Sequence, residues 1–276
     1  MPPTSDPSEY APLLQLATAL ALESAHILTT AGRPATIERK RTSVDLVTEL
    51  DRRVERHVVD RLHHVRPDDG ILGEEGGAAD GVSGVRWLID PIDGTTNFVY
   101  DYPGYAISIG VEVGGQRVVG VVHDVVLAET FAASRGGGAT LNGRVIRVSS
   151  QADLATALVG TGFSYGSDIR ATQAEVLRHV LPRVRDIRRR GSAALDLCWV
   201  ACGRLDAFYE RDHGGPWDIA AGEVIVREAG GLIGGLVGGL DGPALTPGLV
   251  LASGRALFEE LRALLRAAGA SPDADR

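Results

Sequence analysis

The nonapeptide at residues 90–98, Asp-Pro-Ile-Asp-Gly-Thr-Thr-Asn-Phe, constrains this chain more than any other feature of its sequence. Residues 85–89 before it have the pattern of a half-buried strand, which would deliver Asp90 at the carboxyl end of that strand. Asp90 and Asp93 supply hard carboxylate oxygens on a turn enforced by Pro91, and the Gly-Thr-Thr that follows supplies backbone N–H groups and hydroxyls. The segment is therefore predicted to be a strand and a turn that place a cation site next to an anion site.

Phosphate chemistry requires this adjacency of the two sites. A divalent cation must contact the phosphoryl oxygens while nearby donors hold the phosphate in line for attack. Asp-Pro and Asp-Gly dipeptides are also common turn formers, which gives the segment a purely structural interpretation. The nine residues together favour a metal-dependent phosphatase.

Length and charge limit the domain organisation and the kinds of partner that this chain can have. The 276 residues suffice for one large domain or two closely packed subdomains, and no linker-like stretch divides them. A net charge of −8 and a pI near 5.4 disfavour affinity for nucleic acid or anionic membrane, and they suit a cation-binding protein. No uninterrupted apolar run reaches membrane-spanning length, and residues 1–6 lack a basic signal region. We therefore expect a cytoplasmic protein with no nucleic-acid or membrane partner.

Hydrophobic periodicity predicts a mixed α and β chain. Residues 8–31 are rich in Ala and Leu and stop at Gly32, as a helix would, and a second helix over residues 48–65 has one apolar stripe. The members of this stripe are Leu50, Val54, Val58, Leu62 and Val65. Further helices are predicted near residues 171–181, 192–203, 218–229 and 255–268. Strands are predicted at residues 105–113, 117–126, 128–134, 156–163, 205–210 and 249–252.

Two more acidic elements lie far from residue 90 in the sequence. Glu74 and Glu75 sit between glycines after an apolar pair, which fits either a solvated turn or a metal ligand. Asp218 stands at the predicted start of a helix, where it would be an N-cap or a ligand held in its charged form. Taken alone, each of these two elements has a structural explanation. Because the Asp90 segment predicts a cation site, we treat both elements as sources of candidate metal ligands.

Two other motifs have structural interpretations. Residues 162–166, Gly-Phe-Ser-Tyr-Gly, match the G-x-S-x-G elbow of serine hydrolases. That elbow needs a helix starting at the serine, whereas residues 166–168 are expected to be a loop. Cys198 and Cys202 stand four residues apart on a predicted helix, where two thiols cannot complete a metal shell, so we expect them to behave as small buried hydrophobic side chains.

Taken together, these elements resemble the bacterial branch of the inositol monophosphatase family, within the lithium-sensitive, Mg²⁺-dependent phosphatases. The matching segments follow the family's order along most of the chain. They are Lys40 with residues 45–51, residues 73–75, 90–98, 191–197 and 203–210, and residues 217–231.

The resemblance implies an α+β fold, a layered α-β-α-β-α sandwich with mixed, largely antiparallel sheets. It implies a single phosphatase unit over residues 1–276, with two approximate subdomains. Residues 1–150 would hold the metal and catalytic loop, and residues 151–276 would form the substrate side and contribute Asp218. The resemblance also implies a homodimer.

The metal ligands are likewise implied by the resemblance. Two to three Mg²⁺ ions are expected. Glu74, Asp90 and the Ile92 carbonyl would hold the first, while Asp90, Asp93 and Asp218 would hold the second. A third, weaker ion would use Glu74 and water, in keeping with the hydration that Mg²⁺ retains in proteins.

The implied catalytic residues are Glu74 and the pair Thr95 and Asp51, which would orient and deprotonate the attacking water. Asp51 has a simpler explanation as an acidic residue in the first turn of a helix, so its role rests on the resemblance. The residues implied to bind the substrate are Gly94, Thr95, Gly191, Ser192, Ala193 and Glu210.

The implied reaction is hydrolysis of a small phosphorylated polyol by metal-activated water, with inositol 1-phosphate as the expected substrate. Histidinol phosphate, fructose 1,6-bisphosphate and phosphoadenosine phosphate are alternatives within the superfamily. Glu210 suits an amine as well as a hydroxyl, and the basic run at residues 188–190 could meet a second phosphate. A metal-binding scaffold without turnover is the alternative from a different functional class.

Overall fold

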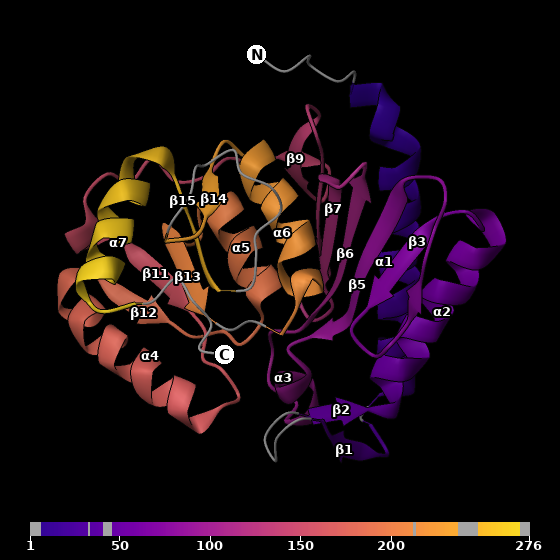
Figure 1. Ribbon diagram of the computed structural model, residues 1–276, viewed down its shortest axis with the longest axis horizontal. Coiled ribbons are helices and arrows are strands. Elements are labelled where there is room, and N and C mark those ends of the chain that lie inside the picture. The colour runs from indigo at the N-terminus through magenta and orange to yellow at the C-terminus, as the bar shows by residue number, and fades with distance from the viewer. Residues whose placement is uncertain (1–6, 33, 41–45, 212–213, 237–247, 271–276) are drawn as a thin grey trace.

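The structure is a computed structural model that describes residues 7–32, 34–40, 46–211, 214–236 and 248–270. Helices and sheets alternate in five layers (Figure 1). Helices α1 and α2 form one outer layer, an eight-stranded sheet the second, helices α5 and α6 the third, a five-stranded sheet the fourth, and helices α4 and α7 the fifth. This arrangement confirms the predicted α-β-α-β-α sandwich.

The α-helices run over the following residues: α1 Ala11–Ala31, α2 Glu49–Val65, α3 Thr95–Val99, α4 Ser167–Val180, α5 Ala193–Ala201, α6 Pro216–Glu228 and α7 Arg255–Ala267. Short 3-10 turns cover Pro7–Tyr10, Leu154–Thr156 and Leu181–Arg183.

The larger sheet has the strand order β10-β9-β8-β7-β6-β5-β3-β4 and is antiparallel except where β3 runs parallel to β5. Its strands are β3 Gly70–Gly73, β4 Ala78–Ala79, β5 Val85–Asp93, β6 Ala106–Val113, β7 Gln116–Asp124, β8 Glu129–Ser134, β9 Gly138–Leu141 and β10 Arg144–Val145.

The smaller sheet has the order β12-β11-β13-β15-β14, and β11 runs parallel to both of its neighbours. Its strands are β11 Leu158–Thr161, β12 Asp186–Arg188, β13 Ala207–Arg211, β14 Leu232–Gly234 and β15 Leu249–Ser253. A separate two-stranded ribbon joins β1 Ile37–Arg39 to β2 Leu46–Thr48. Both main sheets are mixed, as predicted.

Helices α1 and α2 bury their apolar faces against the larger sheet. Four of the five residues predicted to form the α2 stripe are buried, whereas Val65 is 43 % exposed because the helix ends there. Helix α1 with its preceding turn has the length and mean hydropathy of a membrane-spanning helix, although its apolar residues do not form one uninterrupted run. Its inner face packs against α2, β6 and β7, and 33 % of the apolar window is buried, so α1 is a helix of the outer layer that buries one face.

Helix α6 packs closely on the larger sheet because two glycines leave room for it. Gly110 on β6 and Gly120 on β7 are cross-strand partners. A Cβ atom at Gly110 would lie 2.6 Å from the Cβ of Ala220, and one at Gly120 would overlap the backbone of Ala221. This close approach brings the first turn of α6 toward the carboxyl end of β5.

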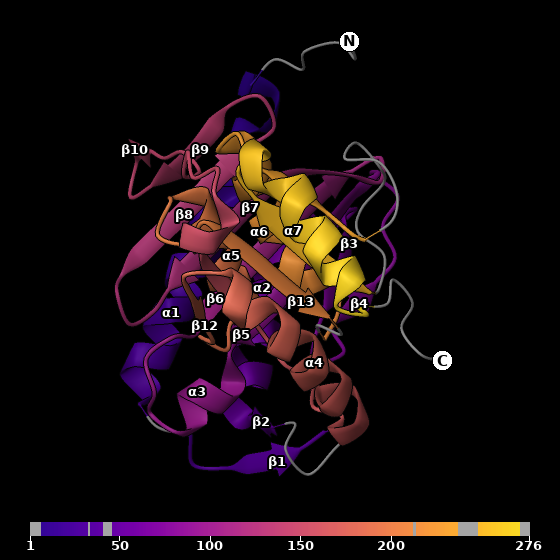
Figure 2. The same ribbon diagram turned by 90° about the vertical axis from the view of Figure 1, so that its left-hand side faces the viewer.

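Helices α4 and α7 cover the outer face of the smaller sheet, as Figure 2 shows from that side. Helix α4 begins at Ser167, so the prediction that residues 166–168 form a loop was wrong. The sequence also gave no signal for the short strands β9, β10, β12 and β14. Strands this short show too little alternation for a pattern to be detected.

Candidate active site

Strand β5 carries Asp90 and Asp93 at its carboxyl end. Residues three apart on a regular strand point to opposite faces. Here Asp90 pairs with Ser108 and Asp93 with Ala106 on β6, so three steps along β5 match two along its neighbour. The extra residue forms a bulge, which turns the two carboxylates toward the same region.

Gly94 makes the turn from β5 into α3. Its φ of 96° is left-handed, and a Cβ there would lie 2.8 Å from the carbonyl oxygen of Gly104 and 3.1 Å from that of Gly191. Only glycine fits both restraints. The turn therefore brings the backbone of α3 close to the segment before α5.

Thr95, the first residue of α3, contacts α2. Its Oγ1 lies 3.1 Å from Asp51 Oδ1 and 3.0 Å from the Ile92 carbonyl oxygen. Asp51 is fully buried in the first turn of α2, where its Oδ2 accepts hydrogen bonds from the backbone N–H and hydroxyl of Thr48. Burial raises the pKa of Asp51 above its usual range, and the Thr48 hydrogen bonds oppose that rise.

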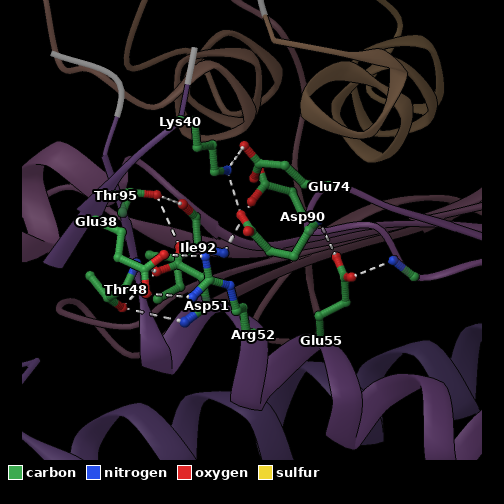
Figure 3. A network of polar contacts seen from close by, with 12 residues as sticks. Glu38, Lys40, Thr48, Asp51, Arg52, Glu55, Glu74, Asp90, Ile92 and Thr95 are labelled. Carbon is green, nitrogen blue, oxygen red and sulfur yellow. Dashed lines mark hydrogen bonds and ion pairs between the residues drawn. The ribbon is translucent and has the colours of Figure 1, made fainter. Parts of the chain in front are cut away.

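Glu74 follows β3, which runs parallel to β5. Its N–H donates to the carbonyl of Ile89, so its side chain emerges beside Asp90. Lys40 pairs with Glu74 at 2.8 Å and also with Glu75 (Figure 3). Burial would lower the pKa of Lys40, but the two glutamates outweigh it and raise that pKa, while burial raises the pKa of Glu75 to about 7.

Asp218 lies in the first turn of α6. Of the two roles considered for Asp218, the N-cap is wrong by three residues, because Gly215 is the N-cap and Pro216 the first helical residue. Proline favours that first position, since the N–H it lacks would have no partner in the helix. Asp218 Oδ2 lies 3.4 Å from the N–H of Gly215, a long hydrogen bond that leaves the carboxylate available for another partner.

The carboxylates of Glu74, Asp90, Asp93 and Asp218 lie close enough to repel one another. Burial raises the pKa of Asp90 well above its usual range, and repulsion from the other three raises it further. The pKa of Asp218 is raised well above its usual range in the same way. Burial also raises the pKa of Asp93, to about 6. Crowded, buried carboxylates of this kind are stabilised when divalent cations lie between them.

The oxygen-only donor set is the kind that Mg²⁺ prefers. As the side chains stand, no three His, Cys, Asp or Glu side chains within the described ranges converge on one point. The Ile92 carbonyl adds a further oxygen next to Asp90 and Asp93 along β5. In their donor chemistry, the residues predicted as metal ligands suit that ion.

Of the residues predicted to bind the substrate at the start of α5, Ser192 contacts Asp93 through its side chain. Ser192 is the N-cap of α5, and its hydroxyl donates to Asp93 Oδ2 at 2.6 Å. The N–H of Ala194 donates to the same oxygen at 2.7 Å. Gly191 has a φ of 88°, a conformation that favours glycine. Ser192 and its neighbour Ala193 thus lie at the acidic cluster, with the Ser192 hydroxyl engaged by Asp93.

Glu210 on β13 extends the cluster toward the smaller sheet. A Cβ at Gly162 would overlap its carboxyl group, so the glycine leaves room for that side chain. Charge repulsion from Glu210 contributes to the raised pKa of Asp218, which brings Glu210 into the same acidic region. Ser164 of the G-x-S-x-G motif precedes α4 by three residues and its Oγ accepts the N–H of Gly166, a geometry unlike the hydrolase elbow.

The site also includes residues that had no assigned role in the sequence interpretation. Glu55 accepts hydrogen bonds from the backbone of the turn that follows Glu74. The signal available was its position four residues after Asp51, which places both carboxylates on one face of the same helix. Glu75, which the sequence pairs with Glu74 in one acidic turn, is a partner of Lys40.

The chain matches the family model described as "Inositol monophosphatase family" over residues 9–270. It is 47 % identical over 240 residues to the Inositol-1-monophosphatase SuhB of Mycobacterium tuberculosis, covering 83 % of this chain and 81 % of that protein. The extragenic suppressor protein suhB of Bartonella henselae superposes with a TM-score of 0.86 at 34 % identity, covering 93 % of this chain and 99 % of that one. An IMPase of Thermotoga maritima gives a TM-score of 0.84 at 35 % identity, with 93 % and 97 % covered.

Proposed function

This chain belongs to the inositol monophosphatase family and is a phosphoric monoester hydrolase, and on that premise we propose that it uses Mg²⁺ to hydrolyse inositol 1-phosphate to inositol and phosphate. One observation carries the Mg²⁺ part of the proposal. It is the set of mutually repelling carboxylates next to the Gly94 turn, made up of the buried Asp90, Asp93 and Asp218 and the partly exposed Glu74. The inositol ester is supported by the names of the relatives and by Glu210 at the edge of the same cluster.

We propose the following ligands for the ions. Glu74, Asp90 and the Ile92 carbonyl would hold one Mg²⁺, and Asp90, Asp93 and Asp218 a second, with Glu74 also serving a third. When bound, Mg²⁺ supplies charge neutralisation of the phosphate and lowers the pKa of coordinated water.

The chain's own groups would orient the water and accept its proton. A Thr95 hydroxyl that donates to Asp51 keeps its oxygen lone pairs free to accept a hydrogen bond from the attacking water. The water oxygen forms the new bond to phosphorus, the bond from phosphorus to the ester oxygen breaks, and Glu74 or the Thr95 and Asp51 pair takes the proton. The departing alkoxide takes a proton from solvent. No covalent enzyme intermediate is required.

The substrate would lie between the two sheets. Backbone N–H groups of Gly94 and Thr95 would hold the phosphate, and Gly191 and Ala193 would line the same wall. Ser192 would act through Asp93, since its hydroxyl donates to that side chain. Glu210 would accept hydrogen bonds from ring hydroxyls, a role that a carboxylate performs well.

We also propose a cytoplasmic, lithium-sensitive homodimer in which residues 1–150 and 151–276 form the two subdomains. One feature supports an assembled state. A cavity lined by Asp196, Trp199 and Arg190 contains three buried atoms with no hydrogen-bond partner among the described residues, namely Arg190 Nε, Asp196 Oδ1 and Trp199 Nε1. Tyr102, which also lines it, is 56 % exposed. Light scattering after gel filtration measures the mass directly.

Phosphate release from four esters tests the function. Inositol 1-phosphate, histidinol phosphate, fructose 1,6-bisphosphate and phosphoadenosine phosphate are each incubated with Mg²⁺, with EDTA and with Mg²⁺ plus Li⁺. We expect Mg²⁺-dependent turnover with preference for the inositol ester, and inhibition by Li⁺. Preference for another ester would reassign the substrate, and equal turnover in EDTA would refute the metal requirement.

A further inference from the structure

Glu55 is a buried carboxylate without a role in the chemistry described above. It lies on α2, four residues after Asp51, and is 4 % exposed. Its Oε2 accepts the backbone N–H of Glu75 and its Oε1 accepts that of Gly77, both at 2.7 Å. Both carboxylate oxygens are thus engaged by one turn, the turn that begins at Glu74.

The turn is built around this carboxylate. A Cβ at Gly77 would lie 2.8 Å from Glu55 Oε1, and one at Gly73 would overlap the carboxyl group. The N–H of Gly73 donates to the carbonyl of Gly77, which closes the turn around the side chain. Two glycines therefore leave the space that Glu55 fills.

Helix α2 contacts both halves of the proposed catalytic machinery. Asp51 in its first turn contacts Thr95, and Glu55 one turn later holds the turn that carries Glu74 (Figure 3). Residues four apart lie on one face of a helix, and the helix fixes their separation. A displacement of Glu74 relative to Thr95 would therefore require one of the two contacts with α2 to break.

We propose that Glu55 is a positioning residue, which fixes the carboxylate of Glu74 in register with the Thr95 and Asp51 pair so that Glu74 can bind a divalent cation. The proposal rests on the proposed function. A glutamine at this position keeps the volume but offers an NH₂ group where one of the two backbone N–H donors needs an acceptor. We expect the turn to lose one of its two restraints.

Mn²⁺ binding to the intact protein tests the proposal without turnover. In calorimetric titrations with wild type and E55Q, we expect the affinity of E55Q to fall about tenfold or more, the loss usual for residues that orient metal ligands. In Mg²⁺-dependent assays with the preferred ester, the half-saturating Mg²⁺ concentration should rise by a similar factor while KM for the ester at saturating Mg²⁺ stays within about twofold.

E112Q is the matched control. Glu112 on β6 is also a buried glutamate, but it pairs with Arg86 at the opposite end of β5 from Asp90. Loss of the Glu112 carboxylate should lower thermal stability without changing Mn²⁺ affinity. This control therefore separates a general loss of stability from a displacement of Glu74. E55D, with a carboxylate one methylene shorter, replaces E55Q if that variant fails to fold, and it should also bind Mn²⁺ more weakly than wild type.

Two outcomes would overturn the inference. If a folded E55Q or E55D binds Mn²⁺ as tightly as wild type, Glu55 is a structural residue only, and the proposed function stands as long as wild type releases phosphate. A wild-type protein that neither binds Mn²⁺ nor releases phosphate would overturn both proposals.

Discussion

The hydroxyl of Thr95 lies 3.1 Å from Asp51 Oδ1, so the first turn of α3 is joined to the first turn of α2 across 44 positions of sequence. Asp51 is held for this contact by Thr48, whose N–H and hydroxyl both donate to the other carboxylate oxygen. One oxygen of Asp51 therefore caps its own helix, and the other is left for Thr95.

Replacing Thr95 with valine keeps the side-chain shape and removes the hydroxyl. If the hydroxyl orients the attacking water, kcat should fall about 10²-fold or more, the usual range for a lost acid or base contact. T95S keeps the hydroxyl and should retain most of the activity. Steady-state phosphate release at saturating Mg²⁺ measures kcat for both variants. Equal losses of kcat in T95V and T95S would contradict the proposed role of the hydroxyl in orienting the water.

Asp93→Asn should abolish phosphate release and leave the fold intact. The asparagine oxygen can still accept from the Ser192 hydroxyl and the Ala194 N–H, so the contact between β5 and α5 survives. What is lost is the negative charge offered to a cation. Circular dichroism should match wild type while turnover falls below detection, and unchanged turnover would refute the assignment of Asp93 as a ligand.

Magnesium should stabilise the folded protein, because it relieves repulsion among Glu74, Asp90, Asp93 and Asp218. A ligand that binds only the native state at 100 times its Kd adds about 2.7 kcal/mol to the free energy of unfolding. Thermal unfolding should therefore shift upward with added MgCl₂ and not with KCl at the same ionic strength. The shift should shrink in D93N, and a full shift there would place the ion elsewhere.

The local parts of this site could be predicted from sequence, and its long-range contacts could not. The Asp90 segment is continuous, so its strand, turn and ligands follow from neighbouring residues. The bulge between Asp90 and Asp93 depends on the partner strand β6, which no local pattern reveals. The bond from Ser192 to Asp93 spans 99 positions and requires the two sheets to be assembled.

The layers were predicted by resemblance, whereas the details of packing come from the structure. Periodicity gave the long helices and the longer strands, since each has a face of its own to bury. It gave no account of how α6 approaches the sheet, because that depends on Gly110 and Gly120 being cross-strand partners. The exposure of Val65 also depends on where α2 ends, and helix ends are the least certain feature of a pattern.

Asp69 makes a contribution to the free energy of unfolding that depends on pH. Its carboxylate accepts hydrogen bonds from Arg66, Ser83 and the Trp87 indole. Burial would raise its pKa, but these partners outweigh burial and lower that pKa below the ordinary 3.8. Stability from this group is therefore complete above pH 3.8 and is lost as the pH falls through the lower folded-state value.

Asp69→Asn should accordingly cost about 1–3 kcal/mol at pH 7, the usual range for a buried charged hydrogen-bond partner. The difference from wild type should narrow as the pH falls below 4, because Asp69 is protonated first in the unfolded chain and, at lower pH, in the folded protein as well. Urea unfolding at pH 7, 5 and 3 measures it. A difference that stays constant over this range would show that the charge of Asp69 contributes nothing.

Gly120→Ala tests whether the close packing of α6 matters for the site as well as for the core. The added methyl would overlap the backbone of Ala221, so α6 must move away from β7 and carry Asp218 with it. Overpacking of this kind costs about 1–3 kcal/mol of stability.

A matched control is G234A on β14, where, among the described residues, the new methyl would meet only Phe258, at the ordinary distance of 3.5 Å. We expect G120A to raise the half-saturating Mg²⁺ concentration as well as lower the melting temperature, because Asp218 would be displaced from Asp90 and Asp93. G234A should change neither by much. If G120A lost stability and kept its Mg²⁺ dependence, the position of α6 would be a matter of packing alone, and Asp218 would tolerate displacement as a ligand.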